Sequence, residues 1–177
     1  MTSFRGKQLT AIAGAIPGFI VVALTLEHAN GLFDFVALPA DDVPGRLAFA
    51  LHWLLLPGIC LLAGVILAGR RGFIPDAIEG TRTPVSRSLE INLRYNQNTL
   101  EQTALACIAW INLAVALPHT QLALIPAMAS LFAIGRVAFW IGYLLNPMGR
   151  AFGMVMTVLP TIGSYVWLLQ HWSAVLH

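Results

Sequence analysis

Four polar residues recur at helical spacing near the middle of the chain: Glu90, Arg94, Asn98 and Glu101. Intervals of four, four and three residues place them on one stripe of a helix, where Glu90 can pair with Arg94 and Asn98 with Glu101. Such a stripe offers donors to carboxylates and an acceptor to an ammonium group. It indicates either a site for a ligand with both amine and carboxylate ends, or a self-satisfied polar ladder that fixes this helix to its neighbours.

A second group consists of Arg136, Tyr143 and Arg150, each seven residues after the one before. Arg136 and Tyr143 are two turns apart on one helix face, whereas Arg150 follows the Asn146-Pro147 break and is expected to begin the next helix. A helix N-terminus has free N–H groups and a partial positive charge, so an added guanidinium favours a bound phosphate, oxyanion or thiolate. The alternative is a basic anchor that reaches lipid phosphate groups.

The segments that carry these residues are apolar enough to lie in a membrane. The 177-residue chain is 58% hydrophobic and 10% charged, with a mean hydropathy of +0.75, whereas soluble domains contain about 25% charged residues. Ionisable groups at membrane depth are costly, so they mark a bundle interior or a watery cavity. Five runs are long enough to cross a bilayer: Leu9–Leu26, Leu47–Leu67, Ile91–Leu117, Leu122–Leu145 and Ala151–Leu176. The sequence therefore predicts an all-α integral membrane protein with five transmembrane helices.

The first run follows two basic residues, as a signal peptide does, but it is long for a signal core and lacks a convincing cleavage site, so we expect an uncleaved helix. Basic residues indicate the orientation. One side of the membrane receives Arg5, Lys7, Arg70, Arg71, Arg82, Arg87 and Arg150, and the other receives Glu27, Asp34, Asp41, Asp42 and Arg46. We predict a multi-pass protein of a bacterial inner membrane, with its N-terminus and active-site loops in the cytoplasm.

The remaining composition narrows the function further. The net charge of +2 follows from this sidedness, and no basic cluster with interleaved aromatic residues indicates nucleic-acid binding. Cys60 and Cys107 lie within apolar runs, where free buried thiols are more common than disulfides or metal ligands. No spacing among histidines and cysteines is typical of a metal site, so we expect none.

Taken together, these residues resemble the MAPEG family, the membrane-associated proteins of eicosanoid and glutathione metabolism. The family pattern E-x3-R-x3-N-x2-E stands here as Glu90, Arg94, Asn98 and Glu101, and its pattern R-x2-aromatic-x2-G-Y, followed by an arginine, stands as Arg136, Phe139, Gly142, Tyr143 and then Arg150. The pair Arg70-Arg71 is similar to one that often ends the family's first helix. The resemblance spans about Leu47 to the C-terminus. Two positions depart from it: Phe139 replaces a frequent tyrosine, and Gln102 replaces a frequent aromatic residue.

The resemblance implies a MAPEG-like four-helix bundle over about residues 47–176, preceded by an additional helix and outward loop in residues 1–46. It implies a homotrimer that binds glutathione as co-substrate between protomers and conjugates or reduces apolar electrophiles from the lipid, as a transferase or peroxidase of detoxification. The implied glutathione contacts are Glu90, Arg94, Asn98, Glu101, Arg136 and Tyr143, with Arg150 stabilising the thiolate and Arg70 or Arg71 near the second substrate.

Two other functions compete with this enzyme. One is a non-catalytic membrane subunit that keeps the bundle for assembly with a partner complex, with Leu9–Leu26 as its docking helix. The other is a small transporter, which the absence of a repeated pair of interrupted hydrophobic segments disfavours.

Overall fold

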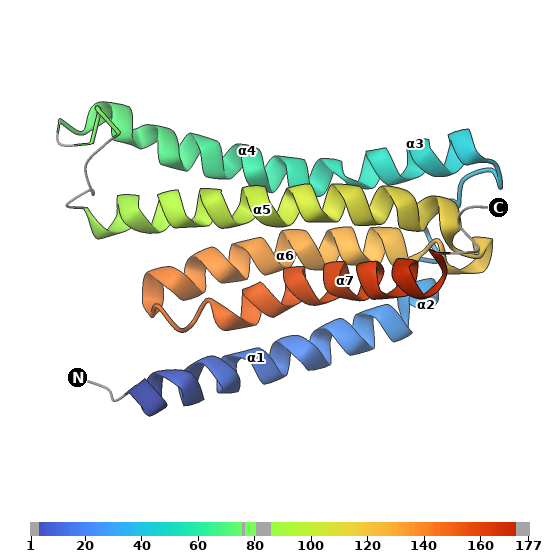
Figure 1. Ribbon diagram of the computed structural model, residues 1–177, viewed down its shortest axis with the longest axis horizontal. Helices are drawn as coiled ribbons and strands as arrows, with labels where there is room; N and C mark the ends of the chain where they lie inside the picture. Colours follow the sequence, from blue (N-terminus) through green and yellow to red (C-terminus); the bar gives the residue numbers. More distant parts are fainter. Residues whose placement is uncertain (1–3, 76, 81–85, 173–177) are drawn as a thin grey trace.

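Five helical spans run along the molecule in the computed structural model, which describes residues 4–75, 77–80 and 86–172 (Figure 1). Each span is long and apolar enough to cross a membrane, and this confirms the prediction of an all-α, five-span membrane protein. Arg82 and the end of the predicted run at Leu176 lie outside the described residues. The spans are α1 (Phe4–Glu27), α3 with α4 (Val43–Trp53 and Leu55–Gly69), α5 (Arg87–Ala116), α6 (Leu124–Leu145) and α7 (Ala151–Gln170), and the connections hold α2 (Ala29–Leu32), η1 (Arg70–Phe73) and η2 (His119–Gln121).

The second span, predicted as one run over Leu47–Leu67, is divided at Leu54 into α3 and α4. Pro57 explains the division, because it has no N–H for the carbonyl of Trp53 and its ring clashes with that carbonyl in a regular helix. The span also begins earlier than predicted. Asp42 caps α3 by accepting a hydrogen bond from the backbone N–H of Gly45 at 2.7 Å.

Helix α5 is the centre of the bundle and packs against α3, α4, α6 and α7. The main hydrophobic core lies along α5 and α6, where Trp110 and Phe132 are fully buried with ring centroids 6.1 Å apart. The outer helix faces carry exposed apolar side chains such as Leu62, Ile66 and Ile134. A hydrocarbon solvent, which does not penalise exposed apolar surface, accounts for this distribution.

Helices α6 and α7 approach closely because glycines face each other across their contact. A Cβ atom at Gly153 would overlap the backbone of Gly135 and Phe139, and one at Gly142 would overlap the carbonyl group of Gly149. The helices therefore pack almost backbone to backbone, and the short turn between them is held against the end of α6. This packing determines where the first residues of α7 lie.

Candidate functional site

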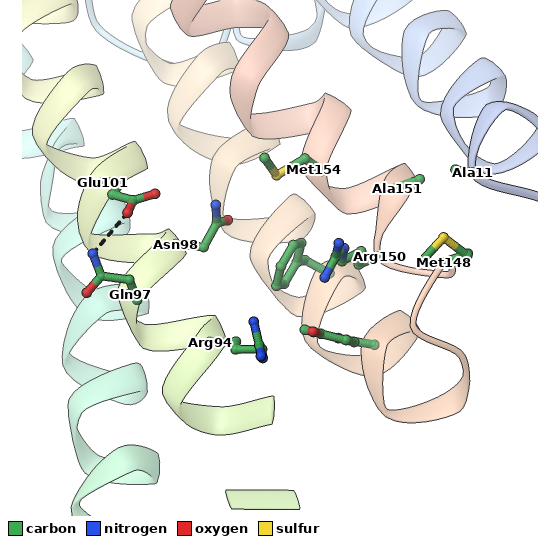
Figure 2. A pocket seen from close by; sticks show the side chains of 11 residues that line it. Ala11, Arg94, Gln97, Asn98, Glu101, Met148, Arg150, Ala151 and Met154 are labelled. Carbon is green, nitrogen blue, oxygen red and sulfur yellow. Dashed lines mark hydrogen bonds between the residues drawn. The ribbon is translucent and has the colours of Figure 1, made fainter. Parts of the chain in front are cut away.

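A pocket of about 490 Å³ lies between α5 and the α6–α7 hairpin, near the beginning of α5 and of α7 (Figure 2). This volume is within the range of about 300–1,000 Å³ that is usual for small-molecule sites. The pocket brings together residues that are far apart in the sequence. Its lining consists of Ala11, Arg94, Gln97, Asn98, Glu101, Phe139, Tyr143, Met148, Arg150, Ala151 and Met154.

One wall of the pocket is formed by Arg94, Asn98 and Glu101 of the polar stripe on α5, whereas Glu90 is not among the lining residues. Glu90 and Arg94 form the expected ion pair, with Arg94 Nη2 2.9 Å from Glu90 Oε1. The expected hydrogen bond between Asn98 and Glu101 is not formed. Glu101 accepts from Gln97 Nε2 at 2.9 Å, and Asn98 accepts from a side chain of α6. The stripe is therefore not a closed ladder along one helix, and Arg94 and Glu101 remain exposed at the pocket.

Arg136 lies behind this wall rather than in it. Its side chain is fully buried, and it donates to Asn98 Oδ1 at 2.7 Å and to Thr157 Oγ1 at 2.8 Å. The guanidinium carbon is 4.6 Å from the ring centroid of Phe139, so cation–π attraction compensates part of its lost hydration. Among the described residues no carboxylate pairs with Arg136, and its Nε has no partner. Arg136 therefore orients Asn98 from behind the pocket wall. The resemblance implied instead that Arg136 contacts the ligand directly.

Arg150 is held at the opposite wall by the turn between α6 and α7. Asn146 ends α6, and its Oδ1 accepts from the backbone N–H of Met148 at 2.9 Å. Arg150 is then the residue that precedes α7, as the sequence predicts, and its guanidinium carbon lies 4.8 Å from the ring centroid of Tyr143. Figure 2 shows Arg150 and Arg94 directed into the same space.

Within the described chain, no hydrogen-bond acceptor or carboxylate partners the Arg150 guanidinium; its contact is the Tyr143 ring. A cation at a helix N-terminus is also disfavoured by the helix dipole, by about 0.3–1 kcal/mol. An anion in the pocket would relieve both the unpartnered donors and the unfavourable dipole. It would accept hydrogen bonds from the guanidinium and lie at the positive end of the helix.

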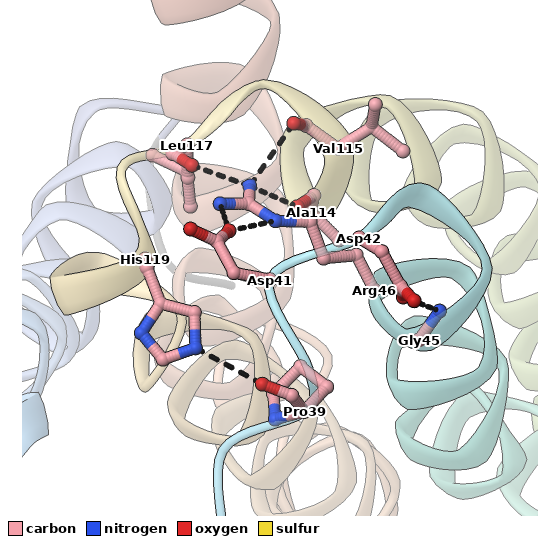
Figure 3. Close-up of polar contacts among 9 residues, drawn as sticks. All are labelled: Pro39, Asp41, Asp42, Gly45, Arg46, Ala114, Val115, Leu117 and His119. Carbon is pink, nitrogen blue, oxygen red and sulfur yellow. Dashed lines mark hydrogen bonds and ion pairs between the residues drawn. The ribbon is translucent and has the colours of Figure 1, made fainter.

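A second buried arginine shows what a purely structural role looks like (Figure 3). Arg46 lies at the other end of α5, where its Nη1 donates to the carbonyl oxygens of Ala114, Val115 and Leu117 at 3.1, 3.0 and 2.6 Å. Its Nε and Nη2 donate to Asp41, and this bond holds the pKa of the Asp41 carboxyl below its ordinary value. Arg46 thus caps a helix C-terminus with every donor group partnered, whereas Arg150 is at a helix N-terminus with its donors unused.

The comparisons with known proteins agree with the pattern of these residues. The family model described as MAPEG family matches residues 46–170. The chain belongs to the MAPEG family.

Two relatives are called transmembrane protein 79. The mouse protein is 26% identical over 93% of this chain and 42% of its own length, and the Bos taurus protein is 26% identical over 91% and 40%. The chain thus spans less than half the length of these curated relatives. No solved structure matches the chain.

The two departures from the MAPEG pattern lie at different depths. Phe139 lines the pocket, with its ring centroid 5.9 Å from that of Tyr143, so it supplies an apolar surface where a tyrosine would supply a hydroxyl group. Gln102 is buried on α5 and is not part of the pocket lining. Only the Phe139 departure therefore changes the chemistry offered to a ligand.

The basic pair after α4 does not line this pocket. Arg70 borders a separate recess of about 30 Å³ with Ser86, Ser88 and Asn92, and Arg71 lies beside Gly80. Neither residue lines the main pocket, so within one chain the structure does not join them to Arg150.

Five residues of the pocket lining were not identified by the sequence analysis, one of them Ala151, which directly follows Arg150. Gln97 could have been found by its i,i+4 spacing to Glu101. Met148 and Met154 flank Arg150 but have no chemistry that separates them from core residues. Ala11 comes from a helix outside the family match, and no local pattern connects it to α7.

Proposed function

We propose that this protein binds glutathione in the α5–α7 pocket, stabilises its thiolate with Arg150 and conjugates it to, or uses it to reduce, apolar electrophiles from the membrane. The observation that carries the proposal is the Arg150 guanidinium, which faces the pocket from a helix N-terminus without an acceptor among the described residues. Membership of the MAPEG family supports it, since that family includes glutathione transferases.

The polar wall fits the functional groups of glutathione, which has two carboxylates, an ammonium group and amides. Arg94 offers donors to a carboxylate, Glu101 offers an acceptor to the ammonium group, and Gln97 and Asn98 offer amides. Arg136 keeps Asn98 oriented through their bond of 2.7 Å. A ligand held by these groups on α5 would extend toward Arg150 on the opposite wall.

Arg150 would act on the thiol. An ordinary thiol has a pKa of about 8.5, so stabilising the anion by about 1.4 kcal/mol lowers that pKa by one unit. In conjugation, the thiolate sulfur forms a bond to the electrophilic carbon, the leaving group departs with its bonding electrons, and the thiol proton passes to water. Tyr143 would support the reaction by holding the guanidinium over its ring, 4.8 Å from the centroid.

The conjugation of an aryl halide by the purified protein in detergent or lipid tests this function. Conjugate formation should require glutathione and should fall by at least about tenfold in Arg150→Gln, equivalent to 1.4 kcal/mol of lost transition-state stabilisation. Arg87→Gln is the matched control, because Arg87 is exposed in the first turn of α5 outside the pocket. Equal rates with and without protein would contradict the enzyme and favour the non-catalytic subunit.

The quaternary arrangement proposed with this function is a homotrimer, as the family resemblance implies. Native mass spectrometry of the detergent-released protein tests it directly. A monomer as the dominant species would overturn the trimer, and with it the binding of glutathione between protomers.

A further inference from the structure

The pocket has two chemically different walls. Its α5 wall is polar, whereas the apolar residues opposite are Ala11 from α1, Met148 from the α6–α7 turn, and Ala151 and Met154 from α7. Arg150 projects from this second wall, and Figure 2 shows Ala11, Ala151 and Met148 grouped on its far side from α5. An apolar wall next to a thiolate-stabilising arginine is suited to an apolar co-substrate.

Helix α1 is held at this wall by close packing on α7. Ala11, Gly14 and Gly18 follow one another at intervals of three and four residues and so share one face of α1. A Cβ atom built on Gly14 would lie 3.5 Å from the Ala151 Cβ, and one on Gly18 would lie 3.0 Å from the Phe152 carbonyl oxygen. The small residues therefore seat α1 on the first turn of α7, directly after Arg150.

The other faces of α1 are turned away from the bundle. Ile12, Ile16 and Ile20 are each more than half exposed, and Ala13 is exposed between them. Helix α1 also lies outside the MAPEG match, which begins at residue 46. Ala11, the residue that α1 contributes to the wall, is thus an addition to the family's four-helix bundle.

We propose that α1 completes the binding wall for the apolar electrophile, and that Ala11 limits the size of electrophile that reaches the sulfur held at Arg150. The proposal rests on the proposed function and deepens it by locating the second substrate. It places that substrate against Ala11, Met148, Ala151 and Met154 rather than beside Arg70 or Arg71.

A reporter thiol in the wall tests the proposal without glutathione. Met148→Cys, next to Ala11 in Figure 2, is introduced into a background with Cys60→Ala and Cys107→Ala, and its rate of alkylation by N-phenylmaleimide, an apolar aromatic electrophile, is measured in detergent. Ala11→Trp should slow this alkylation by about tenfold, because the larger side chain fills the space at the wall. Ala13→Trp, the same change on the exposed face of α1, should leave the rate unchanged.

Two further measurements make every outcome decisive. Ala11→Leu, a smaller change, should slow alkylation by N-phenylmaleimide more than alkylation by the smaller N-ethylmaleimide. This variant replaces Ala11→Trp as the test if Ala11→Trp lowers the melting temperature. Equal alkylation rates in the Ala11 and Ala13 variants would refute the proposed binding wall. Slowed alkylation in the Ala11 variants, together with no glutathione binding by the wild-type protein, would support the apolar binding wall and refute glutathione as the co-substrate.

Discussion

The contact between α6 and α7 should not tolerate a single added methyl group at Gly153. A Cβ atom there would overlap the Gly135 carbonyl oxygen and the Phe139 backbone, and these atoms belong to rigid helices rather than to flexible side chains. Overpacking of a well-packed core costs about 1–3 kcal/mol. Because the obstruction is backbone, we expect Gly153→Ala to reach the upper part of that range.

The consequence for the site follows from what lies beside this contact. Arg136 on α6 donates to Thr157 on α7 at 2.8 Å, so separating the helices weakens the bond that helps to hold Arg136 under Asn98. Gly153→Ala should therefore lower both the thermal stability in detergent and the affinity for glutathione. Gly163→Ala is the matched control, since a Cβ atom at Gly163 meets nothing within 4 Å and should change stability by less than about 0.5 kcal/mol.

Melting temperatures of the two variants, followed by circular dichroism or by aggregation of the detergent-solubilised protein, decide the matter. A Gly153→Ala protein that melts with the wild type would refute the backbone contact between α6 and α7. A loss of equal size in Gly163→Ala would show that the loss of stability is not specific to the contact at Gly153.

Two further predictions concern the arginines. Thr157→Val removes an acceptor from the fully buried Arg136 guanidinium and should lower the free energy of unfolding by about 1–3 kcal/mol. Thr161→Val removes only a bond to a helix carbonyl and should cost less. Equal losses of stability would contradict the role of the bond from Arg136. The bond from Arg46 lowers the pKa of Asp41, so the carboxylate contributes stability above its unfolded pKa of about 3.9, and this is lost as the pH falls through the folded pKa. Asp41→Asn should therefore melt below the wild type at pH 7 and with it in acid, and a difference that persists in acid would contradict this account.

The sequence predicts the spans well because the hydrocarbon core imposes two simple rules. A spanning run must be long enough to cross the bilayer. It must also form a helix, because a helix satisfies its own backbone hydrogen bonds where there is no water. The break at Leu54 was not foreseen, although Pro57 carries its cause, because prolines are tolerated in many membrane helices. The Glu90–Arg94 pair and the position of Arg150 before α7 were both predicted correctly, since each depends only on local spacing or on a chain break.

Contacts between helices were harder to predict. The choice of partner for Asn98 depends on Arg136 from α6, and the burial of Arg136 depends on Thr157 from α7. The contribution of Ala11 to the pocket depends on how α1 sits on α7, which is determined by glycines that have no functional signature of their own. Periodicity along one helix indicates which face is polar, but it does not identify the helix that lies opposite.

The central claim is that Arg150 stabilises an anionic sulfur, and an ultraviolet difference titration with glutathione tests it most directly. At neutral pH, the purified wild-type protein should develop thiolate absorbance that saturates with glutathione, while Arg150→Gln should bind without that absorbance. Arg87→Gln should behave as the wild type does. Binding without thiolate in the wild type, or undiminished thiolate in Arg150→Gln, would contradict the account.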